Sequence, residues 1–123
     1  MSDILSDLYE IIERRKAERE EGSYTVYLFD AGLDKILKKL GEETTETIIA
    51  AKNLERLSEE AEDADDAEEA RGALKGEVSD LLYHLTIMLN ALGVTPDDIE
   101  AVLRGRMQKT GNLKNPHQTD RDS

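Results

Sequence analysis

The chain has 123 residues, a length typical of one domain, and its 16 Lys and Arg against 28 Asp and Glu leave a formal net charge of −12 at pH 7. The absence of Cys excludes a disulfide scaffold, a thiol enzyme and a cysteine-ligated metal site. The negative charge argues against a nucleic-acid polymer as partner, and no apolar run approaches the ~20 residues of a membrane span. Because the N-terminal residues lack the basic-then-apolar order of a secretory signal, we expect a cytoplasmic protein.

The first half of the chain contains two predicted helices. The first starts at the capping residue Ser2 and fades near residues 20–22, and its apolar residues recur at helical spacing at Ile4, Leu5, Leu8, Ile11 and Ile12. Residues 23–29, SYTVYLF, are rich in β-branched and aromatic side chains but are too short and isolated for a sheet, so we expect an ordered loop or a short helical turn. A long second helix is predicted over residues 31–57, with an apolar stripe through Leu33, Ile36, Leu40 and Ile48.

The second half begins with residues 59–69, of which eight in eleven are acidic, and we expect a poor helix or a loop there. A third helix is predicted over residues 73–92, with its stripe at Leu74, Val78, Leu81, Leu82, Leu85, Met88, Leu89 and Leu92. Thr95 caps a fourth helix, which begins at Pro96 and ends near Arg106.

The predicted fold is all-α, a helical bundle of two long and two shorter helices. Residues 1–107 form the domain, with an acidic insert at 59–70, and residues 108–123 form a flexible C-terminal tail. A chain of this size with so few aromatic residues builds only a small core. We therefore expect pairing with further copies of the chain, as a homodimer or higher homo-oligomer, to complete the core.

Four carboxylates flank the apolar stripes of the two long helices at matching offsets. Glu43 and Glu46 lie roughly 70° and 130° from the middle of their stripe, and Glu77 and Asp80 lie roughly 80° and 140° from theirs in the same sense. If the stripes pack together, these carboxylates converge, and a hard divalent cation such as Mg²⁺ would remove their repulsion. The alternative is a set of unrelated surface acids, because the chain contains 28 of them.

Lysines accompany these carboxylates. Lys39 lies on the same side of its helix as Glu43, and Lys52 lies around the flank. A basic edge beside carboxylates suits a site for a metal ion and a polyphosphate. Ordinary ion pairing within the helix is the alternative, although a lysine four residues before a glutamate is the weaker orientation for such a pair.

Four stretches together resemble the phosphoribosyl-ATP pyrophosphohydrolases, the histidine-biosynthesis branch of the all-α, MazG-like nucleotide pyrophosphohydrolases. They are SYTVYLF, KKLGEE, AAKN and DLLYHL, and the resemblance covers about residues 5–111. The carboxylate pattern of that superfamily, E-x-x-E then E-x-x-D, maps onto Glu43, Glu46, Glu77 and Asp80. The chain departs from the family in its long acidic spacer and in Met107, which stands where the family usually has His.

The resemblance implies hydrolysis of phosphoribosyl-ATP to phosphoribosyl-AMP and pyrophosphate, by attack of water on the α-phosphate with Mg²⁺ as cofactor. The implied Mg²⁺ ligands are Glu42, Glu43, Glu46, Glu77 and Asp80. Glu43 and Glu46 are the implied catalytic residues, with Glu46 preferred for orienting the water or accepting its proton. The implied substrate-binding residues are Ser23, Tyr24, Thr25, Lys39, Lys52, Asn53, His84 and Arg106.

Two other functions remain open. A house-cleaning pyrophosphohydrolase acting on free nucleoside triphosphates would use the same carboxylates and Mg²⁺, but nothing would then require the SYTVYLF stretch. A non-enzymatic helical dimerisation module would leave the acids as solvated surface. The excess of acid likewise has two explanations, adaptation to high intracellular salt, which screens self-repulsion, or solubility alone.

Overall fold

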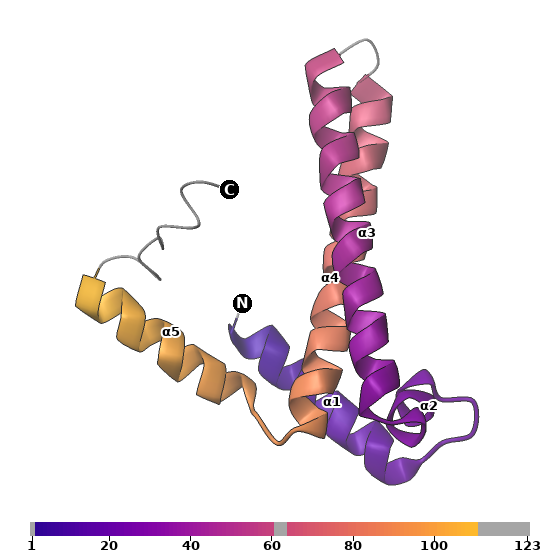
Figure 1. Cartoon of the computed structure of the whole chain (residues 1–123), viewed down its shortest axis with the longest axis vertical. Helices are drawn as coiled ribbons and strands as arrows, with labels where there is room; N and C mark the ends of the chain where they lie inside the picture. Colours follow the sequence, from indigo (N-terminus) through magenta and orange to yellow (C-terminus); the bar gives the residue numbers. More distant parts are fainter. Residues whose placement is uncertain (1, 61–63, 111–123) are drawn as a thin grey trace.

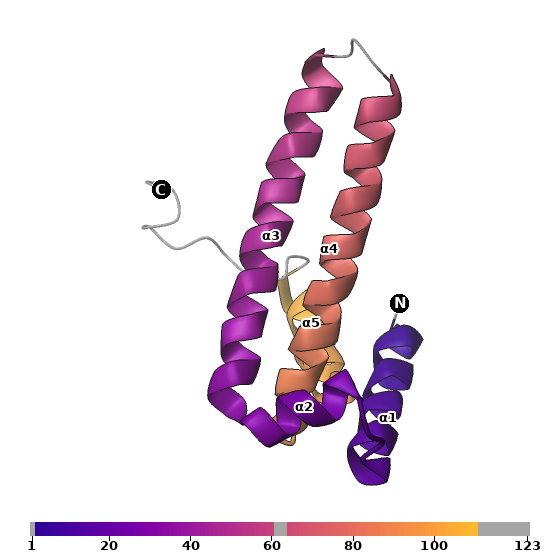
Figure 2. The same ribbon diagram turned by 90° about the vertical axis from the view of Figure 1, so that its right-hand side faces the viewer.

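The computed structural model describes residues 2–60 and 64–110, and five α-helices account for most of this part of the chain. They are α1 (Ser2–Glu18), α2 (Tyr24–Ala31), α3 (Leu33–Glu60), α4 (Ala64–Ala91) and α5 (Pro96–Thr110). Helices α3 and α4 lie side by side and antiparallel as a long hairpin, α1 and α2 pack at its base, and α5 leads away from the base (Figures 1 and 2). The all-α prediction is confirmed, and none of these helices combines the length and apolarity needed to cross a bilayer.

The helix that the sequence did not clearly predict is α2, which covers most of the SYTVYLF stretch. Ser23 caps it, because its side-chain oxygen accepts a hydrogen bond from the backbone N–H of Val26 at 3.3 Å. Gly32 ends it with a φ of 98°, a left-handed conformation that suits glycine, and donates its N–H to the carbonyl of Leu28. With a cap at each end, the segment forms a short helix. Of the two expectations, an ordered loop or a short helical turn, the helical one is confirmed.

Of the two expectations for the acidic insert, a poor helix or a loop, the loop is wrong for its described residues, which are helical. Helix α3 continues to Glu60 and α4 begins at Ala64, while residues 61–63 lie outside the described residues. Glu and Ala both favour helix, so the insert lengthens the hairpin. Asp65 and Asp66 also lie in the first turn of α4, where the helix dipole stabilises negative charge.

The predicted start of α5 is confirmed by a reciprocal cap. The N–H of Asp98 donates to Thr95 Oγ1 at 3.1 Å, and the N–H of Thr95 donates to Asp98 Oδ2 at 2.9 Å. The helix runs to Thr110, beyond the predicted end near Arg106, and continues through Gly105. Most of the predicted tail, residues 111–123, lies outside the described residues.

The core lies at the base of the hairpin, where α1 to α4 meet. Its four central side chains, each at most 1% exposed, are Ile12, Leu28, Ile36 and Ile87. The most deeply buried face of α4 includes Asn90, which lies outside the predicted leucine stripe, whereas the stripe residues Leu85, Met88 and Leu89 are half-buried. The Asn90 side chain donates to Glu13 at 2.5 Å and accepts from Lys16 at 3.1 Å, so hydrogen bonds satisfy a polar residue inside.

We expect added salt to stabilise this fold. The described acids near the hairpin tip repel one another, and dissolved ions screen that repulsion; they are Glu59, Glu60, Asp65, Asp66, Glu68 and Glu69. The thermal unfolding midpoint is therefore expected to rise between 0.05 M and 2 M KCl, as followed by circular dichroism at 222 nm. Equal midpoints at both concentrations would contradict adaptation to high salt.

Candidate active site

Three carboxylates converge where the middle of α3 faces α4. Glu43 comes from α3, and Glu77 and Asp80 come from α4. One oxygen of each lies within 4.8 Å of the others, which is close enough for a single cation to contact all three. The helical offsets predicted the convergence of four carboxylates, and three of those four meet here without Glu46; we call these three residues the carboxylate cluster.

The cluster is electrostatically unsatisfied. Glu43 is only 9% exposed, and Glu43 Oε2 and Glu77 Oε2 are buried without a hydrogen-bond partner among the described residues. Burial and then the negative charge of Glu46 raise the pKa of Glu43, and burial followed by Glu46 also raises the pKa of Glu77. Because buried carboxylate oxygens without partners cost free energy, the donor set fits a divalent cation.

Glu46 adjoins the cluster without belonging to it. It lies one turn after Glu43 on α3, is exposed, and is near enough to Glu77 to hydrogen-bond with it. Glu42, the other predicted ligand, does not join the three carboxylates and instead pairs with Lys39 at 3.1 Å. Glu46 thus presents an exposed carboxylate beside the cluster.

Lys39 and Tyr24 occupy the side of the cluster nearest the base of the hairpin. Burial raises the pKa of the Tyr24 hydroxyl, the positive charge of Lys39 opposes this rise, and Glu43 adds to it. The phenol of Tyr24 is therefore within electrostatic reach of both Lys39 and Glu43. The pKa of Lys39 is itself raised by its hydrogen bond to Glu42, so its ammonium group stays charged at neutral pH.

Two consecutive residues of α2, Tyr24 and Thr25, form hydrogen bonds to α4 beside the cluster. His84 Nδ1 donates to the carbonyl oxygen of Asp80 at 2.7 Å, which leaves Nε2 of the neutral ring to accept from the Tyr24 hydroxyl at 2.9 Å. Thr25, which is 1% exposed, hydrogen-bonds the hydroxyl of Tyr83. No role was predicted for Tyr83, although its position one turn after Asp80 and next to His84 could have indicated a place beside the cluster.

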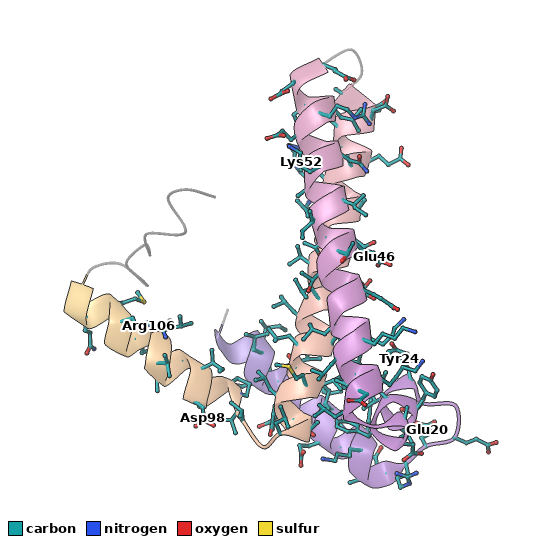
Figure 3. The ribbon with its side chains drawn as sticks, in the orientation of Figure 1. Glu20, Tyr24, Glu46, Lys52, Asp98 and Arg106 are labelled. Carbon is teal, nitrogen blue, oxygen red and sulfur yellow. The ribbon has the colours of Figure 1, made fainter. Side chains whose placement is uncertain are left out.

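The remaining predicted residues are placed differently. Ser23 caps α2, and Asn53 lines a cleft that begins at Glu46. Lys52 lies on another side of α3 from Glu46, and Arg106 lies on α5, far from Glu46 (Figure 3). Within one chain, α3 and α5 therefore do not bring Lys52 or Arg106 to the carboxylates, and their roles in substrate binding stay predictions.

We expect Mg²⁺ to stabilise the folded chain, because it would neutralise the repulsion within the cluster and bind only the folded state. The unfolding midpoint is expected to rise by several degrees with 10 mM MgCl₂, and Glu77→Gln is expected to lose most of that rise. Differential scanning calorimetry measures both midpoints. KCl of matched ionic strength is the control, and an equal rise with KCl would contradict a specific site.

A helical hairpin that gathers carboxylates from both of its helices beside a lysine is the arrangement expected of an all-α nucleotide pyrophosphohydrolase. Comparison with known proteins narrows this class. The sequence model of one family, phosphoribosyl-ATP pyrophosphohydrolase, matches residues 5–107. The chain belongs to the phosphoribosyl-ATP pyrophosphohydrolase family, as the resemblance predicted.

Individual relatives agree with the family match. A protein of Streptococcus thermophilus is 50% identical over 110 residues, which are 89% of this chain and 91% of the relative. A protein of Pelotomaculum thermopropionicum is 46% identical over 107 residues, 87% of this chain and 94% of the relative. A protein of Listeria innocua is 46% identical over 114 residues, 90% of this chain and 95% of the relative. All three are named phosphoribosyl-ATP pyrophosphatase.

Proposed function

We propose that this chain hydrolyses phosphoribosyl-ATP to phosphoribosyl-AMP and pyrophosphate, as an enzyme of histidine biosynthesis in the cytoplasm. The observation that carries the proposal is the carboxylate cluster, with two buried oxygens that lack partners, in a member of this family. The names of the relatives supply the substrate. The cluster explains why the substrate is a polyphosphate, because a bound divalent cation would attract one.

Each carboxylate has a proposed task. Glu43, Glu77 and Asp80 would hold Mg²⁺, which would neutralise negative charge on the phosphates. Glu46, exposed beside them, orients the attacking water and accepts its proton. Lys39 contacts the departing phosphates through its ammonium group, which requires exchange of its present partner Glu42 for substrate.

The position of attack can be tested with isotopically labelled water. If water attacks the α-phosphate, hydrolysis in H₂¹⁸O places the label in phosphoribosyl-AMP, and the released pyrophosphate stays unlabelled. Mass spectrometry of phosphoribosyl-AMP and of pyrophosphate shows which product carries the label. Label in the pyrophosphate would overturn the proposed attack at the α-phosphate.

We also propose that the chain acts as a homodimer or higher homo-oligomer. Large apolar side chains stand exposed on the single chain, among them Ile48 and Ile49 of α3 and Val102 and Met107 of α5. Burial of such side chains against a second copy would lower the free energy of the folded state. Sedimentation equilibrium tests this, and a mass of 13.8 kDa at all concentrations would contradict it.

A further inference from the structure

Tyr83 on α4 lies between the core and the carboxylate cluster. It follows Asp80 by one turn, and its side chain packs against the core that contains Leu28. Its hydroxyl group hydrogen-bonds the hydroxyl group of Thr25, a side chain that is only 1% exposed. Because Thr25 is shielded from solvent, loss of the Tyr83 hydroxyl would leave a buried polar group without its partner, which costs free energy.

The residue before Thr25, Tyr24, forms a second hydrogen bond from α2 to α4. Its hydroxyl donates to His84 Nε2 at 2.9 Å, and its ring stacks on that of Tyr83, with the ring centroids 6.3 Å apart. Adjacent residues of a helix point about 100° apart, so the two hydrogen bonds together fix the rotation of α2 about its axis. Either bond by itself constrains that rotation less, because the burial of Leu28 is a non-directional contact.

The rotation of α2 decides where the Tyr24 hydroxyl lies. Tyr24 is 43% exposed and lies at the base of the hairpin (Figure 3). Its hydroxyl is within electrostatic reach of Lys39 and Glu43. In the proposed function, Lys39 contacts the departing phosphates and Glu43 helps to hold the cation. A small rotation of α2 would therefore displace the phenol relative to the reacting phosphates.

We propose that Tyr83 is a positioning residue for this hydrolysis, because its hydroxyl, bonded to Thr25, fixes α2 so that Tyr24 stays beside the carboxylate cluster. This inference rests on the proposed function and adds a residue that acts without touching the substrate. The Tyr83 hydroxyl is engaged with Thr25, so its effect reaches the reaction through α2. A displacement of about 1 Å lowers the rate of an oriented reaction by up to about 100-fold, so one buried hydrogen bond has a measurable effect on kcat.

The first test is Tyr83→Phe, which removes the hydroxyl and keeps the ring that packs against the core. We expect kcat for phosphoribosyl-ATP to fall about tenfold and KM to stay within about threefold, because Lys39 and the carboxylates keep their places. Thr25→Val removes the other hydroxyl of the pair and is expected to act in the same way. Steady-state pyrophosphate release measures both constants.

Thr86→Val is the matched control. Thr86 lies on the same helix and is 2% exposed, but its hydroxyl donates to the carbonyl oxygen of Leu82 within α4. Its replacement likewise removes a buried hydroxyl and is expected to leave kcat within about twofold of the unaltered chain. An equal fall of kcat in Thr86→Val and Tyr83→Phe would indicate a general effect of stability and would overturn the inference.

Two further measurements test whether Tyr83 acts through α2. Once Tyr24→Phe has removed the phenol hydroxyl, its placement no longer matters, so the addition of Tyr83→Phe is expected to change kcat by less than about twofold. Exchange of the Gly32 backbone N–H, which bonds the Leu28 carbonyl at the end of α2, is expected to accelerate about fivefold in Tyr83→Phe. Thr86→Val is expected to leave this exchange rate unchanged, and NMR measures it.

Three results would overturn the inference: near-normal kcat in Tyr83→Phe, losses that multiply in the double variant with Tyr24→Phe, or unchanged exchange at Gly32. Failure of the proposed function is distinguishable from these results. Absence of phosphoribosyl-ATP hydrolysis by the unaltered chain would overturn the proposed function, and the exchange rates would still test whether Tyr83 fixes α2.

Discussion

Replacing Glu46 with Gln is expected to lower kcat for phosphoribosyl-ATP about 100-fold or more, because the amide cannot accept a proton from the attacking water. Glu46 is exposed, so the fold does not depend on it, and the helical circular dichroism is expected to stay unchanged. Steady-state pyrophosphate release measures the rate. Glu77→Gln is expected to act similarly by weakening the Mg²⁺ site.

The matched control for this prediction is Glu59→Gln. Glu59 lies on the same helix and is also exposed, but it is distant along α3 from the carboxylates. Its replacement removes one negative charge and is expected to leave kcat within about twofold of the unaltered chain, as a surface change away from the site does. Near-normal turnover in Glu46→Gln would refute the role assigned to Glu46.

The largest loss of stability is expected from Ile87→Ala. The Ile87 side chain is fully buried among Ile12, Leu28 and Ile36, and its truncation removes apolar contact and leaves a cavity. The free energy of unfolding is expected to fall by about 2–5 kcal/mol. Urea titration followed by circular dichroism measures it.

Ile4→Ala provides the same chemical change at a position that is 58% exposed. It is expected to cost under about 1 kcal/mol, because an exposed side chain loses little contact on truncation. Equal losses in the two variants would contradict the placement of the core at the base of the hairpin.

The convergence of the carboxylates was predictable from sequence because it depends on helical geometry alone. Once two long helices and their packing faces are assumed, a turn of 100° per residue places Glu43 and Glu77 toward each other. Glu42 was harder to place, because the same geometry allows it to reach either the cluster or Lys39. In the structure, Glu42 forms an ion pair with Lys39.

The core was only partly predictable. Ile12 and Ile36 lie in their predicted stripes, but Ile87 does not lie in the leucine stripe predicted for α4. Its neighbours on the most deeply buried face are His84 and Asn90, which are polar, so apolar periodicity indicates only the half-buried flank of this face, where Met88 packs against the core. Their hydrogen bonds to α1 and α2 make that burial possible, and no periodic pattern reveals such long-range partners.

The placement of α2 also depended on contacts that sequence spacing does not show. Thr25 was predicted to touch substrate, whereas its side chain is buried against Tyr83. The pair is formed by residues 58 positions apart, on different helices. This short segment, with one cap at each end, docks through Leu28, which is buried in the core, and through hydrogen bonds to Tyr83 and His84.

The most direct test of the central claim is pyrophosphate release from phosphoribosyl-ATP, ATP and dUTP, each with Mg²⁺ and with excess chelator, at low and at high KCl. We expect release from phosphoribosyl-ATP alone, and its loss on chelation. Release from the free triphosphates instead would keep the metal site but contradict the proposed substrate. No pyrophosphate release from any of the three substrates at either salt concentration would contradict the proposed enzymatic activity and favour a helical dimerisation module.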